Sequence, residues 1–209
     1  MKRKPAVTPT FLALTGLTAA ALLAGCAVTN IPPPAFYQLR SEAPAAVVPV
    51  TTTHVLQLLS VTLPEVLERD ALVVSQGQAG VQALTDHRWA EPLRDAVPRL
   101  LRQDLALLLG DSRVWAAAVP AGVVVTRQLR VEVLVLQTAA DRNAVQLQAR
   151  WTLSDPLGRT PPLVRVTQLS VPSSGSTPDA WVAAHRLALW QVAGQVAEQV
   201  AEQVAKAVP

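Results

Sequence analysis

The sequence predicts a single domain of the α/β class, more narrowly α+β, in which two main amphipathic helices pack against a largely antiparallel sheet of about six strands. Residues 145–154 alternate strictly between apolar and polar side chains, the pattern of a strand with one buried face and one wet face. Residues 93–108 and 178–206 instead carry apolar side chains at helical spacing. These three segments indicate the sheet and both helices.

The strand candidates are separated by residues that favour turns. Gly77 and Gly80 lie between two β-like runs, which is typical of a hairpin, and Pro64 ends the run before them. The six main candidates are residues 54–62, 71–76, 81–84, 123–138, 145–154 and 163–171, and residues 36–39 and 113–115 are short additional ones.

The last three strand candidates predict an antiparallel meander. Turn-forming Asp, Asn, Pro and Gly occupy residues 141–143 and 155–158, between the strands. The strand at 163–171 alternates less regularly, so we expect it nearer an edge of the sheet. In the first of the three strands, the side chains expected on the buried face are Val125, Leu129, Val131, Val133 and Val135.

The first helix is predicted to stop at Gly110, a residue common just after a helix end. Pro92 suits a first helical position. Pro98 does not suit a helix interior, because it removes a hydrogen bond and crowds the carbonyl of Arg94. We therefore expect either a kink at Pro98 or a helix that begins properly only near that residue.

The second helix is predicted to start at Thr177 as N-cap, with Pro178 in the first position, and to run to about Lys206. Its end nearly repeats Val-Ala-Glu-Gln, and a four-residue spacing drifts around a helix of 3.6 residues per turn. The last turns could therefore leave the core and be exposed or partner-bound, or could simply fray. The apolar line consists of Val182, Leu189, Val192, Val196, Val200 and Val204.

The N-terminus has the pattern of an export signal. Basic residues 2–4 precede a charge-free stretch at residues 11–24, which is shorter than the roughly 20 residues of a membrane-spanning helix. The stretch ends in Leu23-Ala24-Gly25-Cys26, which resembles the bacterial lipobox. The resemblance implies cleavage between Gly25 and Cys26 and lipidation of the Cys26 thiol. The alternative is an ordinary signal peptide with an incidental cysteine.

Three segments follow from this interpretation: a cleaved signal at 1–25, the lipidated cysteine with a proline-rich tether and first strand at 26–53, and the main domain at 54–209. A cysteine with two or three acyl chains is a lasting anchor that needs no transmembrane helix. Ala27, rather than Asp, follows the cysteine, which favours the periplasmic face of the outer membrane under sorting rules of the enterobacterial kind.

Composition excludes several classes of function. The signal carries three of the 18 basic residues and no acidic ones, so the processed chain has 15 of each sign (18 − 3 = 15). This balance offers no electrostatic case for a nucleic-acid partner. Cys26 is the one cysteine, and lipidation would leave no thiol for a metal or a disulfide.

Catalytic motifs are missing from the sequence, so we predict neither enzymatic activity nor a cofactor. His54, His87 and His185 lack zinc-binding spacing, and no G-x-S-x-G or phosphate-binding motif occurs. The segment His87-Arg88-Trp89-Ala90-Glu91 precedes the first helix. It is interpreted first as a structural entry to that helix with Trp89 buried, second as a partner contact, and last as a catalytic group.

Taken in order, the landmarks of the chain resemble the PqiC (YmbA) family of ABC-type transport auxiliary lipoproteins. The block from Arg88 to Leu93 is the most specific of them, whereas Pro98 and the Val-Ala-Glu-Gln repeat depart from the family pattern. The landmarks are Leu23-Ala24-Gly25-Cys26, Phe36-Tyr37-Gln38-Leu39, Leu63-Pro64-Glu65 with Arg69, His87-Arg88-Trp89-Ala90-Glu91-Pro92-Leu93, Arg130-Val131-Glu132-Val133, Ala149-Arg150-Trp151 and Ala183-Ala184-His185.

The resemblance implies a mixed sheet with helices against it and a role in lipid transport across the envelope. Its implied partners are an MCE-domain (PqiB-like) protein, which forms a tunnel across the periplasm, and an inner-membrane component; binding of phospholipid and assembly into a homo-oligomer are left open. The competing hypotheses are a docking lipoprotein, a lipid-binding periplasmic shuttle, an anchored hydrolase and an unrelated envelope-assembly lipoprotein.

Overall fold

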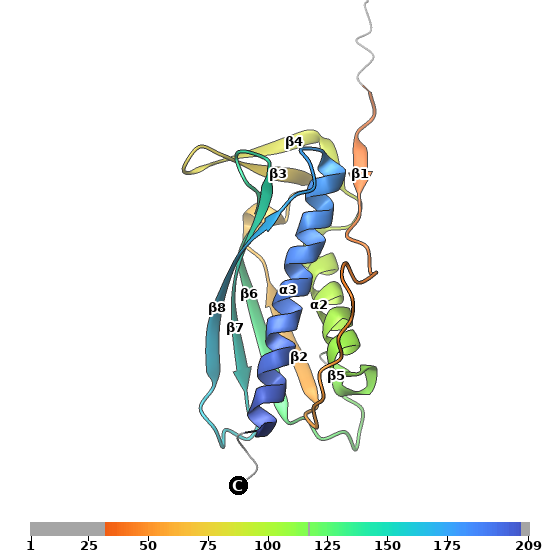
Figure 1. Cartoon of the computed structure of the whole chain (residues 1–209), viewed down its shortest axis with the longest axis vertical. Helices are drawn as coiled ribbons and strands as arrows, with labels where there is room; N and C mark the ends of the chain where they lie inside the picture. The colour runs from red at the N-terminus through yellow and green to blue at the C-terminus, as the bar shows by residue number, and fades with distance from the viewer. Residues whose placement is uncertain (1–31, 117, 206–209) are drawn as a thin grey trace, which may run out of the picture. The chain divides into compact units, whose positions relative to one another are not determined.

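The computed structural model describes residues 32–116 and 118–205, with side chains through residue 202 (Figure 1). The described residues from Pro34 onward form one compact unit. The predicted signal, the lipobox with Gly25 and Cys26, and the side chain of Val204 lie outside the described residues.

The described residues form one mixed sheet of eight strands with two long helices, which confirms the α+β class and corrects the strand count from about six to eight. The two additional strands are short, with three and two residues. The strands are β1 (Ala35–Tyr37), β2 (Leu56–Thr62), β3 (Ala71–Gln76), β4 (Gly80–Trp89), β5 (Val114–Trp115), β6 (Arg127–Thr138), β7 (Ala144–Ser154) and β8 (Leu163–Pro172).

Strand β6 is the centre of the sheet, because it pairs with three other strands. Along one edge it pairs antiparallel with β7, which in turn pairs with β8, so the predicted meander is confirmed. Its other edge carries β2 in parallel pairing and, further along, β3 at Thr138. Strand β8 pairs with β7 alone and is therefore an edge strand, as its irregular pattern predicted.

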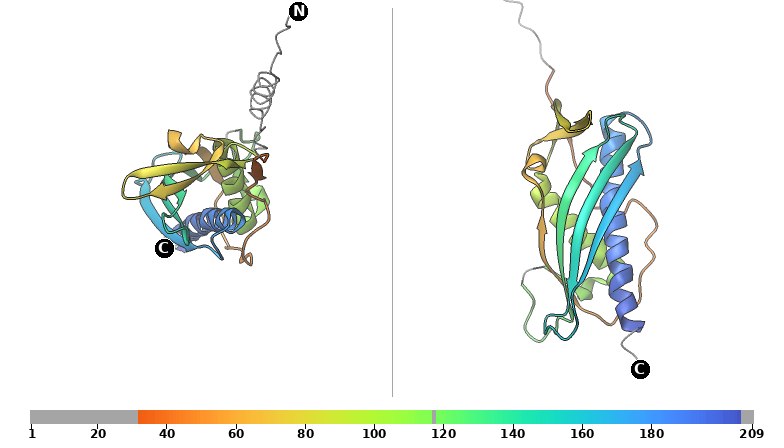
Figure 2. Two further views of the ribbon diagram at one scale, coloured as in Figure 1. Left: turned by 90° about the horizontal axis from the view of Figure 1, so that it is seen from above. Right: turned by 90° about the vertical axis from the view of Figure 1, so that its left-hand side faces the viewer.

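Both long helices cover the same face of the sheet (Figure 2). Helix α2 (Leu93–Leu109) packs on β2 and β5, and helix α3 (Pro178–Ala205) packs on β6, β7 and β8. Apolar side chains from both layers fill the space between them, which is the main source of stability in a domain of this size. The largest fully buried ones include Leu56, Leu100, Leu105, Leu129, Leu153 and Leu189.

A β-bulge in β6 corrects the predicted buried face of that strand. The pairing with β7 shifts between Val133 and Val135, so Leu134 is an extra residue and the alternation reverses after it. Val133 is buried, but Val135 is only half-buried and Leu136 takes the place in the core. The strand also begins at Arg127 rather than at residue 123, so Val125 lies before it.

The ends of the helices lie close to the residues that the sequence predicted, whereas Pro98 in the interior of α2 does not delay the start of that helix. Helix α2 begins at Leu93 and continues through Pro98, so a helix that starts only near Pro98 is wrong. Pro92 is its N-cap, one position before the first helical position predicted for it. Gly110 ends the helix with φ at 99°, a backbone conformation that favours glycine. At the start of α3, the Ala180 N–H donates to Thr177 Oγ1 at 3.3 Å, which is the predicted cap.

The apolar line of α3 stays in the core through Val200. The predicted drift out of the core does not occur in that part of the helix, because Val192, Val196 and Val200 are all almost completely buried. The first exposed side chain beyond Val200 is Glu202.

Candidate functional site

The segment from His87 to Glu91 lies at the seam between β1 and β4. Strand β4 runs to Trp89, five residues beyond its predicted end, so His87, Arg88 and Trp89 belong to a strand rather than to a helix entry. The reason is a partner that the sequence does not show: β1 pairs in parallel with these three residues. The Ala90 N–H then donates to the Tyr37 carbonyl at 2.8 Å, which closes the seam.

His87 contacts the side chain of Tyr37 across this seam. The Tyr37 hydroxyl and His87 Nδ1 lie 2.9 Å apart, and the two ring centroids are separated by 5.6 Å. Partial burial and the nearby negative charge of Asp179 raise the pKa of Tyr37. The hydroxyl therefore stays protonated at neutral pH and can take part in this hydrogen bond as either donor or acceptor.

Trp89 points into the core, where its ring contacts His185 of helix α3. The two centroids are 5.5 Å apart with the ring planes at 72°, an edge-to-face arrangement. The His185 Nδ1–H donates to the Trp181 carbonyl at 2.8 Å. Burial lowers the pKa of His185 to about 4, so this imidazole is neutral at neutral pH and acts as a packed, hydrogen-bonded core residue.

Glu91 connects the end of the seam to helix α2. Its carboxylate accepts hydrogen bonds from Arg99 Nη2 at 2.6 Å and Arg99 Nε at 3.3 Å. Arg99 Nη1 also donates to Ser41 Oγ at 3.1 Å, so the same guanidinium fixes the loop that follows β1. About 30 % of each charged side chain is exposed, which makes this a half-buried structural ion pair.

Arg88 differs from its neighbours because its side chain is exposed. It stands opposite Phe36 in the β1–β4 register, and its Nε–H donates to the Thr85 carbonyl at 3.3 Å. The four residues singled out in the sequence thus lie in three different environments: Trp89 in the core, His87 and Glu91 in separate half-buried pairs, and Arg88 at the surface. They do not converge on one point, as a catalytic group would.

A buried ion pair between the helices was missed in the sequence. Arg186 of α3 donates to both carboxylate oxygens of Asp104 of α2, at 2.6 and 2.8 Å, and its Nε donates to the Arg40 carbonyl at 2.8 Å. Burial raises the pKa of Asp104, against the opposing effect of the Arg186 hydrogen bonds. The available signal was the position of Asp104 within the apolar repeat of its helix, between Leu101 and Leu105.

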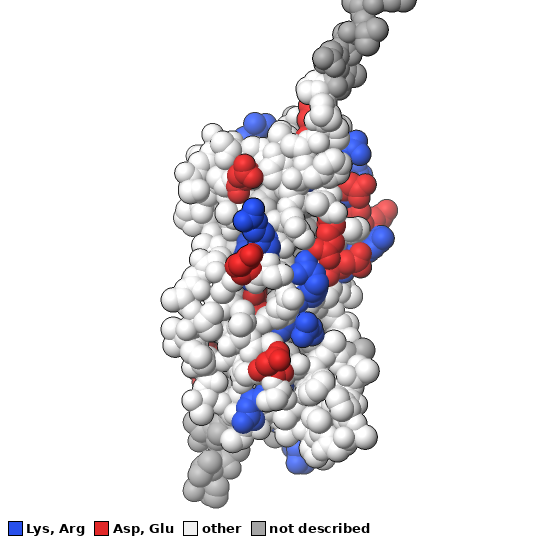
Figure 3. Space-filling view, turned by 90° about the vertical axis from the view of Figure 1, so that its right-hand side faces the viewer, with Lys and Arg blue, Asp and Glu red and all other residues white. Residues whose placement is uncertain are grey.

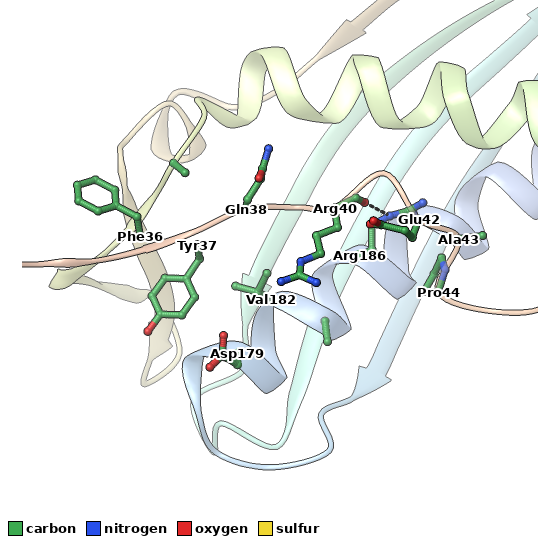
Figure 4. Close-up of a pocket in the computed structure, with 12 residues that line it drawn as sticks. Phe36, Tyr37, Gln38, Arg40, Glu42, Ala43, Pro44, Asp179, Val182 and Arg186 are labelled. Carbon is green, nitrogen blue, oxygen red and sulfur yellow. Dashed lines mark hydrogen bonds between the residues drawn. The ribbon is translucent and has the colours of Figure 1, made fainter.

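A cleft of about 770 Å³ lies between the β1 segment and helix α3 (Figure 4). Tyr37, Val182 and the buried Arg186 are among the residues that line it. Its charged side chains have both signs, with Arg40 and Arg186 against Glu42 and Asp179. This mixture does not make an anion-binding site of the kind that selects phosphate.

Charges of both signs are also intermingled on the flank of the domain shown in Figure 3. The pairs Glu91–Arg99 and Arg94–Asp95 belong to α2 and its entry. Within residues 32–116 and 118–202, no cluster of three or more metal-ligating carboxylate or imidazole side chains occurs. No helix in the part of the chain that the structure describes is long and apolar enough to cross a bilayer.

Two solved structures have the same fold. A crystal structure of an uncharacterized protein superimposes with a TM-score of 0.64 at 18 % identity, covering 81 % of this chain and 99 % of that one. A protein from Xanthomonas campestris gives a TM-score of 0.62 at 16 % identity, with 82 % and 99 % coverage. At these identities the likeness establishes the fold alone. The comparison with curated proteins gives no match.

The family is established by a family model that matches residues 37–197. The matched region begins at Tyr37 in β1 and ends at Ala197 in α3, so it includes every strand from β2 to β8, all of α2, and α3 up to Ala197. Its description is the ABC-type transport auxiliary lipoprotein component. The chain therefore belongs to the family of ABC-type transport auxiliary lipoproteins, as the order of its sequence landmarks predicted.

Proposed function

We propose that this protein is the lipid-anchored docking subunit of an MCE-type system that moves lipids between the two membranes of the envelope. In this account Cys26 holds the domain at the periplasmic face of the outer membrane, and the folded domain receives an MCE-domain protein that reaches from the inner membrane. The observation that carries the proposal is the family match over residues 37–197 in a chain whose lipobox ends at Cys26.

The packed interior of the domain favours the docking hypothesis over the hypothesis of a shuttle that encloses its lipid. The space between the sheet and the helices is filled, and a gap there, next to Trp89 and His185, measures about 10 Å³, room for roughly one water molecule. A phospholipid acyl chain needs a far larger apolar cavity. A shuttle would therefore have to use the open cleft beside β1, which is lined by charged side chains of both signs.

The proposed partnership is tested by co-purification under defined expression. The lipidated protein and an MCE-domain protein of the same envelope are produced together, and the MCE protein is purified by its own tag. We expect the lipoprotein to elute with it in stoichiometric amount. A second preparation with Cys26→Ala, exported by an ordinary signal, separates contact from anchoring, because contact through the folded domain should survive in detergent. No co-elution of either form would overturn the docking role.

The shuttle alternative has its own test. Delipidated protein is mixed with labelled phosphatidylglycerol below its vesicle-forming concentration, and bound lipid is counted per protein. We expect no binding at a defined stoichiometry. One lipid per chain, lost on changing Val182→Trp in the cleft wall, would favour the shuttle over docking.

A further inference from the structure

Phe36 is an exposed aromatic side chain at the point where the chain enters the domain. Its exposed fraction is 64 %, and within residues 32–116 and 118–202 every other aromatic side chain is at least partly buried. Figure 4 shows that Phe36 and Tyr37 leave β1 on opposite sides, with Tyr37 on the side where Asp179 lies. The Phe36 ring lines the edge of the open cleft but stays mostly exposed, so burying it in an apolar environment would be favourable.

The position of Phe36 in the chain limits what it can reach. It follows Cys26 by ten residues, which span at most about 35 Å when fully extended. Pro32, Pro33 and Pro34 lie within this tether and favour an extended backbone. A lipid attached at Cys26 would thus keep Phe36 close to the membrane surface at all times, at a high effective concentration.

Arg88 provides a cation beside this ring. It stands opposite Phe36 in the parallel β1–β4 register, so both side chains project from the same face of the sheet, and both are exposed. An aromatic ring next to a long basic side chain suits the boundary of a bilayer. There the ring enters the edge of the acyl region, and the guanidinium extends to the phosphate layer.

The tip of the neighbouring hairpin can approach a bilayer without burying charge. Residues 71–85, which form β3 and most of β4, contain no ionisable side chain, and residues 76–82 are all exposed. Figures 1 and 2 both show this hairpin at the same end of the domain as β1. Moving this neutral surface into the headgroup layer avoids the cost of desolvating charged groups.

We infer that Phe36, with Arg88 beside it, is a second contact with the membrane that carries the lipid anchor. It seats the β1–β4 end of the domain on the lipid surface. The inference rests on the proposed anchor at Cys26 and adds an orientation to it: the β1–β4 end faces the bilayer. The loop before β6, which contains Val124, and the loop between β7 and β8, which contains Leu157, lie at the opposite end and face away (Figure 1).

The test measures depth in the lipidated protein held in nanodiscs of phosphatidylethanolamine and phosphatidylglycerol. Single cysteines are introduced as Phe36→Cys, Val124→Cys or Leu157→Cys and labelled with the fluorophore NBD; lipidation blocks the native thiol of Cys26. The two control sites match Phe36 because they are apolar and 75 % and 73 % exposed. A fourth variant, Arg88→Cys, keeps the Phe36 ring and labels its neighbour.

We expect NBD at position 36 to shift to shorter wavelength and to lose intensity when the lipids carry a nitroxide on the acyl chain. NBD at position 88 should lose intensity with a nitroxide on the headgroup. The controls at 124 and 157 should respond to neither. A water-like signal at 36 and 88, or equal quenching at all four sites, would overturn the inference.

Flotation of the same samples separates this inference from the proposed function. Protein that floats with lipid while its label at position 36 stays in water would contradict the Phe36 contact alone. Protein with an intact Cys26 that fails to float, as Cys26→Ala is expected to fail, would contradict the anchor itself.

Discussion

The carboxylate of Asp104 in helix α2 accepts two hydrogen bonds from the guanidinium of Arg186 in helix α3, and both side chains are almost fully buried. The same guanidinium donates to the Arg40 carbonyl, so it ties both helices to the segment that follows β1. The Cζ atom of this guanidinium lies over the Trp190 ring, 5.9 Å from the ring centroid. This arrangement satisfies a pair of charges that would otherwise be costly to bury.

Breaking this pair should destabilise the domain strongly. Asp104→Ala leaves the Arg186 charge buried without its partner, and we expect a loss of about 3–5 kcal/mol in the free energy of unfolding. Urea denaturation measures this loss. The control is Glu132→Ala in the exposed pair Glu132–Arg150, with an expected loss below about 1 kcal/mol. Equal losses at the two sites would contradict the buried role of Asp104.

Replacing both charges together should cost less than breaking the pair. In the double variant Asp104→Leu with Arg186→Met, no uncompensated charge remains in the interface, although the hydrogen bond to the Arg40 carbonyl is lost. We expect it to be more stable than Asp104→Ala, because apolar replacement of a buried pair is often neutral or stabilising. A double variant less stable than the single one would show that the charges specify the packing of the two helices.

Trp89 and Arg88 are adjacent in the sequence but should behave differently when truncated. Trp89→Ala removes a buried ring that contacts His185, and we expect a loss of about 3–5 kcal/mol in the free energy of unfolding. Arg88→Ala removes an exposed side chain and should change stability by no more than about 0.5 kcal/mol. Normal melting of Trp89→Ala together with abolished partner binding would overturn this assignment.

Stability should fall on acidification through the pH range set by His185. Its pKa is about 4 in the folded protein and 6.5 when exposed, so between these values the unfolded chain binds the extra proton. Stability is therefore full above pH 6.5 and declines as the pH drops toward 4. The depression corresponds to about 3 kcal/mol for this one group.

The variant His185→Gln isolates this effect, because glutamine can donate to the Trp181 carbonyl without titrating. We expect its stability to depend less steeply on pH between 4 and 6.5 than that of the natural protein. Part of the slope should persist, since burial also lowers the pKa of His54 and acts in the same direction. Thermal melts in buffers across this range provide the comparison, and an unchanged slope would exclude His185 as its source.

Local patterns in the sequence predicted the elements that depend on local physics. The alternation in β7 and the Thr177 cap of α3 each rest on a few adjacent residues. The edge position of β8 also followed, because an edge strand needs less regular alternation. The bulge at Leu134 could not be predicted from alternation, since it arises from a shift in pairing with a strand that follows.

The features that could not be predicted from the sequence depend on contacts between segments that are far apart in the chain. Strand β4 extends to Trp89 because β1, about 50 residues earlier, pairs with its end. The partner of Asp104 lies 82 residues away on another helix. A charged residue within an apolar repeat signals that a partner exists, but the identity of that partner depends on the tertiary arrangement.

The central claim, that this domain works while anchored at Cys26, is tested most directly in a strain that lacks the protein. The strain is complemented either with the natural chain or with Cys26→Ala exported by an ordinary signal, at equal periplasmic levels, and survival in detergent is measured. We predict that the natural chain restores survival and the unlipidated chain does not. Full restoration by the unlipidated chain would contradict the account.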